Sequence, residues 1–589
     1  MPATTRRSGT NAKSGNGRAP HDRKTGSFPD DAAEEPVAPE SIAGGEPASI
    51  PALGQILAAA AATLGQGTAV TRESLRFGRE LVKIGLGRSA IAPDKGDRRF
   101  TDPAWESNPA FHRLEQSYLA ASESLGRLIE GLDGRVSDRT AETARFAGGL
   151  LAAAASPTNF FWTNPGAIKK AFDTGGASVV RGTRHLVHDL RHNGGFPEMV
   201  DRSGFEVGRN LAVSPGAVVE RDEIAEVIQY STRADTVFQR PVLVVPPPIG
   251  RFYFLDLAPG RSFVEYATGQ GQQVFMLSWR NPTPEQGHWN LDTYAARVSS
   301  AITTVQEVTG APDVNLMVFC AGGIISTVAL SHMAATGDDR VHSVSYAVTL
   351  LDFGERAPIA AYNSSGLISF ARRRSLRKGI ITSQQMGSAF TLMRPNDLLF
   401  NYVVNNYLLG EKPPAFDILA WNADGTNLPG ALHAQFLDIF RHNLLVQAGA
   451  VQVLGTPVDL STIKVPMFVT GAVTDHLTPW RGCYRTTQLL GGESTFVLSY
   501  SGHIASLVNP PGNPKAHYWV GGPPVPDPEE WLRGAERRSG SWWERWVEWV
   551  EPYSGSKKPA PARLGSSSRP PLEPAPGLYV RDKVPGSAT

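Results

Sequence analysis

Apolar residues divide the chain into a first part with helical spacing and a second part with short, strand-like runs. Between about residues 51 and 200 the apolar positions recur every three or four residues, as they do on one face of a helix. We therefore predict a helical N-terminal domain over residues 49–205. The spacing is clearest in PALGQILAAAAATLGQG, AWESNPAFHRLEQSYLAASESLGRLIEGL and NPGAIKKAFDTGGASVVRGTRHLVHDLR.

From about residue 206 onward, short apolar runs replace the helical spacing. Helical segments near 292–308, 323–335 and 481–490 separate most of these runs. Strands that are apolar throughout and alternate with helices are typical of a parallel sheet covered on both faces, so we predict an α/β catalytic domain over residues 206–589. The runs are PVLVVP (241–246), QQVFMLSW (272–279), VNLMVF (314–319), VSYAVTLL (344–351), VPMFVTG (465–471) and STFVLS (494–499).

Two segments depart from these patterns. Residues 354–455 are too long for a connection between strands and have helical and aromatic content of their own, so we predict an inserted lid or cap. Residues 1–48 are rich in glycine, proline, serine, alanine and mixed charge, with almost no large apolar side chains. Such a segment cannot bury enough apolar surface to become ordered, and we predict a disordered tail.

The composition excludes several classes of protein. A chain of 589 residues is too long for one small core, so we expect at least two folded units plus tails. Lysine and arginine number 57 against 56 for aspartate and glutamate, and this balance leaves no basic field that would attract nucleic acid. The two cysteines, Cys320 and Cys483, are too few for a disulfide framework or a metal cage, which fits a reducing cytoplasm.

The sequence predicts neither a leader peptide nor a membrane span. Arg6 and Arg7 are followed by polar sequence rather than an apolar core, and the run AGGLLAAAAS near 147–156 is too short to cross a bilayer. We expect a cytoplasmic protein with no membrane span, no nucleic-acid partner, no cofactor and no metal.

One of the two cysteines stands at the end of a predicted strand. In VNLMVFCAGGIIS an apolar run ends at Cys320, glycines follow at 322 and 323, and a helical pattern begins. Strand, nucleophile, tight turn and helix in this order form the nucleophile elbow of α/β-hydrolases, whose turn needs small neighbours. On this motif alone, catalysis and burial of a structural cysteine both remain open.

The elbow departs from its usual pattern at one position. The residue two before the nucleophile is usually glycine, and here it is Val318. A β-branched residue there crowds the turn, so we expect Val318 to shift the backbone of the elbow without abolishing it.

Two partners for Cys320 follow in the order that this fold requires. Nucleophile, acid and base succeed one another along the chain. Asp475 comes after the run at 465–471 and His503 after the run at 494–499, at strand ends where active sites gather in open α/β sheets. We predict that His503 takes the thiol proton and that Asp475 orients the imidazole.

Other residues compete for these roles. His476 is adjacent to Asp475 but precedes the last strand, which makes it the less suitable base. Asp352 ends the preceding run and is an alternative acid. Cys483 lies in the helical pattern WRGCYRTTQLL, where we predict packing.

An oxyanion hole requires two backbone N–H groups. We predict that Ala321, the residue after the nucleophile, supplies one of them. The second should come from the loop VVPPPIGRFYFLDL, in which Ile249 and Gly250 are the candidates because proline has no N–H.

A tryptophan-rich segment, SWWERWVEWVEPY (541–553), ends the strand-rich part. Trp542, Trp546 and Trp549 share one helical face, with charged residues opposite. We predict a helix packed on the catalytic domain. A surface for a hydrophobic polymer or granule is the alternative.

At these residues the chain resembles the polyhydroxyalkanoate (PHA) synthases. The resemblance extends from about 98 to 580, and the order of the motifs makes it specific. The motifs are DRRFTDPAW, SPTNFFWTNPGAIKKAF, GRNLAVSPGAVV, VPPPIGRFYFLDLAPG, MRPNDLLFNYVVNNYLLG, FDILAWNADGTNLPG, DHLTPW, SGHIASLVNPPGNPKA and GSWW. The resemblance implies an α/β-hydrolase fold with Cys320 as the acylated nucleophile, His503 as the base and Asp475 as the third member.

The resemblance also implies substrate and partners. The substrate would be an (R)-3-hydroxyacyl-CoA, and the product a polyester that grows at a granule surface. Members of this length need no second subunit type (class I/II) and form homodimers, and several motifs are more similar to the medium-chain branch, class II. Trp421 in LAWN matches a tryptophan linked to activity, with core packing as the plain alternative.

The implied mechanism has open points. The Cys320 thiolate attacks the thioester, CoA leaves, and a 3-hydroxyl group then attacks the acyl enzyme, with His503 or Asp475 as its base. The lid would exclude water. A basic run in the lid could meet the CoA phosphates or form a solvated helix face; its members are Arg372, Arg373, Arg374, Arg377 and Lys378.

Two other functions remain open on sequence grounds. The same residues would serve a thiol-dependent hydrolase, either a thioesterase or a polyester depolymerase. A non-catalytic scaffold with a decayed elbow is the third hypothesis, for which Val318 is the one hint.

Overall fold

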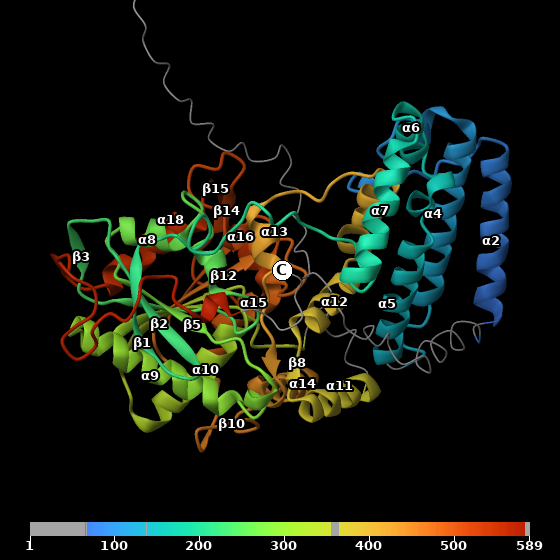
Figure 1. Cartoon of the computed structure of the whole chain (residues 1–589). Helices are drawn as coiled ribbons and strands as arrows, with labels where there is room; N and C mark the ends of the chain where they lie inside the picture. The colour runs from blue at the N-terminus through green and yellow to red at the C-terminus, as the bar shows by residue number, and fades with distance from the viewer. Residues whose placement is uncertain (1–64, 66, 137, 355–364, 583–589) are drawn as a thin grey trace, which may run out of the picture. The chain divides into compact units, whose positions relative to one another are not determined.

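The computed structural model describes residues 65–582 apart from 66, 137 and 355–364 (Figure 1). The predicted tail at 1–48, most of the first helical stretch at 51–67 and the start of the predicted lid therefore lie outside the described residues. None of the helices in the described ranges combines the length and the hydropathy needed to cross a membrane.

The first described part of the chain is helical, as its spacing predicts. Two helices begin at Asn-Pro pairs: the Asn108 side chain accepts a hydrogen bond from Ala110 N, and the Asn164 side chain from Ala167 N. Asparagine caps the free N–H groups of a first turn, and proline fits its first position. The helices are α2 (Gly67–Gly85), α3 (Ala104–Ser107), α4 (Pro109–Glu130), α5 (Asp138–Ala154), α6 (Pro165–Asp173) and α7 (Ala177–His192).

A ten-stranded sheet forms the centre of the second part. Its order is β1-β2-β5-β4-β6-β7-β12-β13-β14-β15, and the six strands from β5 to β13 are parallel. The strands are β1 (Gly216–Arg221), β2 (Ala225–Tyr230), β4 (Val242–Val245), β5 (Val274–Trp279), β6 (Val314–Phe319), β7 (Val341–Ala347), β12 (Met467–Ala472), β13 (Ser494–Ser499), β14 (His517–Val520) and β15 (Glu536–Ser539).

The six predicted strands are parallel, and the sheet is extended at both edges by antiparallel strands that the sequence did not predict. β1 and β2 pair antiparallel with each other and β2 with β5, while β14 and β15 form an antiparallel hairpin on β13. β15 is exposed along its whole length, so its sequence carries no apolar run. The predicted strand at 344–351 also ends early, at Ala347, because the chain turns at Val348 with φ +45°.

Helices cover both faces of the sheet. Leu243 and Val245 of β4 point into one core together with residues of α9 (Leu291–Thr309), α10 (Ala321–Thr336) and α15 (Trp480–Leu489). Val242 and Val244 point into the other, with α8 (Phe263–Gly269), α16 (His503–Leu507) and α18 (Trp542–Val550). This alternation follows from the two-residue period of a strand.

The tryptophan-rich helix α18 packs on the sheet, as predicted. Trp542, Trp543, Trp546 and Trp549 are all buried, which excludes the alternative of a tryptophan surface for a polymer. Trp546 Nε1 donates to Ser345 Oγ on β7 at 3.0 Å. Trp542 and Trp543 donate to main-chain oxygens of α16, at 2.8 and 3.0 Å. α18 therefore fixes the short helix that begins at His503.

An inserted segment, residues 365–457, lies between β7 and β12. α7 packs closely against it at Gly182, where an added Cβ would overlap the carbonyl of Tyr407. Tyr407 OH also donates to Asp189 Oδ2 of α7 at 3.0 Å. The inserted segment contains α11 (Ser365–Lys378), β8 (Ile380–Ile381), α12 (Ser383–Met393), two π-helical turns (Asn396–Phe400, Val403–Leu408), α13 (Asp417–Asn422), β9 (Leu428–Pro429), α14 (Gly430–His442), β10 (Gln452–Val453) and β11 (Thr456–Pro457).

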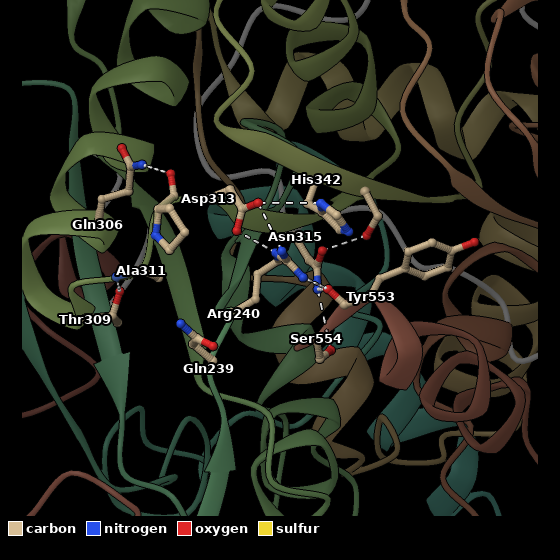
Figure 2. A network of polar contacts seen from close by, with 12 residues as sticks. Gln239, Arg240, Gln306, Thr309, Ala311, Asp313, Asn315, His342, Tyr553 and Ser554 are labelled. Carbon is tan, nitrogen blue, oxygen red and sulfur yellow. Dashed lines mark hydrogen bonds and ion pairs between the residues drawn. The ribbon is translucent and has the colours of Figure 1, made fainter. Parts of the chain in front are cut away.

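A polar network ties the chain together where the parallel strands begin (Figure 2). Arg240, before β4, donates to both carboxylate oxygens of Asp313, before β6, at 2.5 and 3.0 Å. The Nδ1 atom of His342, on β7, lies 3.5 Å from Asp313 Oδ2. Asn315 Nδ2 donates a hydrogen bond to Tyr553 O at 3.3 Å. This network is at the amino ends of the strands, whereas Cys320, Asp475 and His503 follow their carboxyl ends.

Candidate active site

Cys320 occupies a strained turn between β6 and α10. Its φ and ψ are +47° and −122°, a region that residues other than glycine rarely adopt. A Cβ added to Gly322 would lie 2.5 Å from Val245 O, and one added to Gly323 would overlap the Thr349 side chain. Glycine is required at both positions because α10 passes so close to the strands, which is the local arrangement of a nucleophile elbow.

Val318 is accommodated inside the strand. It is fully buried in β6, and its Cα pairs with Val245 on one side and Tyr346 on the other. The one register irregularity between β6 and β7 falls at Val314, four residues earlier, so the elbow is kept and no break in strand pairing accompanies Val318.

Asp475 and His503 meet across the ends of β12 and β13. His503 Nδ1 lies 2.6 Å from Asp475 Oδ2, and both side chains are buried. The other carboxylate oxygen accepts hydrogen bonds from Leu477 N and Thr478 N at 2.8 and 2.9 Å. Both oxygens of Asp475 are therefore occupied within the protein, as a buried carboxylate requires.

The electrostatics of the pair favour a charged imidazole. Burial alone would lower the pKa of His503, but the charge of Asp475, the hydrogen bond to it and the neighbouring Cys320 raise that pKa to about 10. Burial would likewise raise the pKa of Asp475, but the charge of His503 and hydrogen bonds from His503 and Thr478 lower it. Asp475 thus stabilises a protonated His503 beside the Cys320 thiol.

Thr478 completes the hydrogen bonding of this pair and was not among the predicted residues. Its hydroxyl donates to Asp475 Oδ2 at 2.6 Å and lies 3.1 Å from His503 Nδ1. The signal in the sequence is a threonine three residues after the aspartate in DHLTPW, where side chains often bond the loop that holds them.

The competing residues serve other contacts. Asp352 accepts hydrogen bonds from Asn443, Gly354 N and Arg485 at 2.8, 2.8 and 2.5 Å, and it anchors the chain where the inserted segment departs. Burial would raise the pKa of Asp352, but these hydrogen bonds and the Arg485 charge lower it. The imidazole whose Nδ1 lies 2.6 Å from Asp475 Oδ2 is that of His503.

Cys483 is buried in α15, as the helical pattern predicts. Its Sγ donates to Thr478 O at 3.4 Å, and burial raises the pKa of this thiol well above the ordinary value. A thiol held neutral in this way is a poor nucleophile.

The three predicted oxyanion donors differ in their surroundings. Ala321 is the first residue of α10, where an N–H has no acceptor within the helix. The Gly250 N–H donates to Thr426 Oγ1 of the inserted segment at 2.9 Å. Ile249, half-buried in the same loop, has no such contact among the hydrogen bonds of the described residues.

Trp421 packs against this loop. It is buried, its Nε1 donates to Arg251 O at 2.7 Å, and its ring lies 5.3 Å from that of Phe254. These contacts account for Trp421 as a packing residue within one chain.

The described residues offer one group with metal-ligand chemistry, away from the elbow in sequence. One atom from each of His188, Asp189 and Glu198 lies within 4.8 Å of the others. The Asp189 carboxylate, however, already accepts from Asn193 at 2.7 Å and from Glu198 N and Tyr407 at 3.0 Å. The group therefore fits a packing contact between α7 and the inserted segment rather than a metal site.

Comparisons with known proteins agree with this geometry. Residues 96–267 match the family model of the N-terminus of poly-beta-hydroxybutyrate polymerase (PhaC), and residues 256–510 match that of the alpha/beta hydrolase fold. Poly(3-hydroxyalkanoate) polymerases 2 and 1 of Ectopseudomonas oleovorans are 44% and 42% identical, over 87% and 86% of this chain and 93% and 90% of theirs. The corresponding PhaC subunit of Cupriavidus necator is 37% identical over 85% of each chain. The predicted α/β-hydrolase fold is confirmed.

Proposed function

The chain belongs to the poly(3-hydroxyalkanoate) polymerase family, an acyltransferase family, and on that premise we propose that Cys320 carries the acyl group during polymerisation. The observation that supports this most strongly is the 2.6 Å contact between His503 and Asp475, beside a cysteine in a strained elbow. The expected substrate is an (R)-3-hydroxyacyl-CoA and the product its polyester.

In the first step the enzyme takes the acyl group from CoA. The proton of the Cys320 thiol is held on His503, which Asp475 keeps charged, and the Cys320 thiolate attacks the thioester carbonyl carbon. The oxyanion that forms is stabilised by the N–H groups of Ala321 and Ile249; Gly250 is the weaker candidate because its N–H is engaged by Thr426. The bond from carbon to the CoA sulfur then breaks, and CoA leaves with the proton from His503.

In the second step the acyl group moves to a hydroxyl. Because the acyl enzyme is itself a thioester, it stays activated for transfer. A base removes the proton of a 3-hydroxyl group, the alkoxide attacks the acyl carbon, an ester forms, and the Cys320 sulfur departs. His503 is the better base, since both oxygens of Asp475 are already occupied by Leu477, Thr478 and His503.

The surroundings suggest further roles. We propose that the inserted segment is the lid that excludes water from the acyl enzyme. The basic residues of α11 are the candidates for the CoA phosphates, and one of them, Arg372, also pairs through Nε with Asp438 at 3.1 Å inside that segment. A homodimer, a cytoplasmic location at polyester granules and medium-chain substrates complete the proposal, the last supported by the motif similarities.

Replacement of Cys320 by alanine, with 3-hydroxyacyl-CoA as substrate, tests the proposal. We expect the parent to release CoA and form insoluble polymer, and Cys320→Ala to do neither. Release of CoA with only free 3-hydroxy acid would indicate a thiol-dependent hydrolase instead. Release of CoA by Cys320→Ala at the parent rate would refute the assignment of the nucleophile.

A further inference from the structure

Thr426 belongs to the inserted segment and contacts the loop that offers the second oxyanion donor. It is buried, with 2% of its surface exposed. Its hydroxyl accepts a hydrogen bond from Gly250 N at 2.9 Å and donates one to Pro248 O at 2.8 Å. One side chain, 178 residues away along the chain, thus contacts the main chain on both sides of Ile249.

These two bonds determine the direction of the Ile249 N–H. The carbonyl of Pro248 and the N–H of Ile249 belong to the same planar peptide unit and point in opposite directions. Because the Thr426 hydroxyl binds the carbonyl edge of this unit, it turns the Ile249 N–H away from Thr426. Its second bond, to the next N–H along the chain, keeps the neighbouring peptide unit from rotating.

The loop needs such a support because its backbone would otherwise be free to rotate. Gly250 has φ +85°, and glycine adopts positive and negative φ values about equally readily, so this residue does not hold its own conformation. The ring of Trp421 lies close to Gly250: a Cβ added to Gly250 would be 3.3 Å from that ring. The Trp421 indole N–H also holds the Arg251 carbonyl. Hydrogen bonds of Trp421 and Thr426 therefore reach Pro248, Gly250 and Arg251, the residues on either side of Ile249.

We infer that Thr426 is a positioning residue, which holds the Ile249 N–H in the direction of the oxyanion formed at Cys320. The inference rests on the proposed function, because it takes Ile249 as the second donor. It also makes the inserted segment part of the catalytic apparatus: a movement of Thr426 would change the oxyanion hole without any change at Cys320, His503 or Asp475.

Valine and serine at position 426 separate this role from simple packing. Thr426→Val keeps the shape but loses both hydrogen bonds, whereas Thr426→Ser keeps the hydroxyl. Thr391→Val is the matched control, because Thr391 is a buried threonine of the same segment whose hydroxyl bonds only its own helix, at Gly387 O. The measurements are kcat and KM for CoA release, the thermal midpoint, and the rate at which iodoacetamide alkylates Cys320, located by peptide mass.

Alkylation is the informative comparison, since it needs the reactive thiolate but forms no oxyanion. For Thr426→Val we expect kcat to fall about 10- to 100-fold with KM within about twofold of the parent, and an unchanged alkylation rate. Thr426→Ser and Thr391→Val should stay within about threefold of the parent kcat.

Two results would overturn the inference. One is a parental kcat in Thr426→Val. The other is a loss of alkylation in proportion to kcat, which would indicate general damage to the site. The proposed function is tested separately by Cys320→Ala in the same assay: if that variant releases CoA normally, the function fails, whereas normal turnover in Thr426→Val alone removes only the role of Thr426.

Discussion

At the scale of single residues, the chemistry depends on what surrounds Cys320 more than on the cysteine itself. The chain has a second thiol, Cys483, that is buried in a helix with a raised pKa. Cys320 differs because its turn is strained and because a buried carboxylate, Asp475, holds a charged imidazole next to it. The same residue type is thus inert in one environment and suited to nucleophilic chemistry in the other.

Asp475→Asn removes the charge that keeps His503 protonated. We expect kcat for CoA release to fall about 10³- to 10⁴-fold, since the imidazole loses both its orientation and the stabilisation of its charged form. Steady-state CoA release over a range of substrate concentrations measures this. A loss of less than about tenfold would show that another group orients His503.

The same variant predicts a pH dependence of stability. The pKa of His503 is raised in the folded protein to about 10, so the stability that its protonation contributes is complete below the unfolded pKa of about 6.5 and is lost as pH rises through about 10. Asp475→Asn lacks this contribution. The difference in thermal midpoint between parent and variant should therefore narrow between pH 7 and pH 10, and a constant difference would contradict the raised pKa.

At the scale of elements, the parallel sheet separates stability from chemistry. The strands begin at the network of Arg240, Asp313 and His342 (Figure 2) and end at the loops that carry the candidate site. Parallel strands place all their carboxyl ends on one edge, so residues far apart in sequence converge there. At the amino ends of the strands, the network joins the strand starts to the segment after α18.

Asp313→Asn tests that separation. It removes the charged, two-point contact with Arg240, and we expect a loss of about 1–3 kcal/mol in stability with kcat unchanged. Glu536→Gln is the control, because Glu536 and Arg538 form an ion pair on the exposed strand β15, where we expect no more than about 0.5 kcal/mol. Urea unfolding and CoA release measure the two quantities. A fall in kcat for Asp313→Asn at full folding would mean that the network reaches the site.

The sequence predicted the elements whose residues are apolar throughout and missed those that are not. β4, β6 and β13 correspond closely to their runs, because strands buried on both faces carry mostly apolar side chains. β15 was missed because a strand exposed along its whole length has no such requirement, and β14 because it is only four residues long and partly buried. Asp475 and His503 followed from chain order, whereas the contacts of Thr478 and Thr426 arise from side chains that meet only in three dimensions.

At the scale of the whole molecule, the inserted segment links otherwise separate parts of the chain. It contacts α7 through Tyr407, and it contacts the loop at residues 248–251 through Trp421 and Thr426. A change in α7 can therefore reach the loop at residues 248–251 through the inserted segment. This arrangement gives the helical part a contact with the inserted segment that neither its composition nor its spacing predicted.

Gly182→Ala tests the contact between α7 and the inserted segment. The added methyl group would overlap the Tyr407 carbonyl, so we expect a loss of about 1–3 kcal/mol and faster proteolysis within the inserted segment. Gly78→Ala in α2 is the control, since nothing lies within 4 Å of its new methyl group and alanine favours the helix. Equal proteolysis of the two variants would argue against this link.

The central claim is that the acyl group is carried on Cys320, and trapping it is the most direct test. The protein would be mixed with a labelled 3-hydroxyacyl-CoA, quenched in acid within the first turnover, digested and analysed by mass spectrometry. We expect a thioester-linked 3-hydroxyacyl group on the peptide that contains Cys320, and none in Cys320→Ala. Polymer formation with the label on Cys483, or with no acyl group on any cysteine, would contradict it.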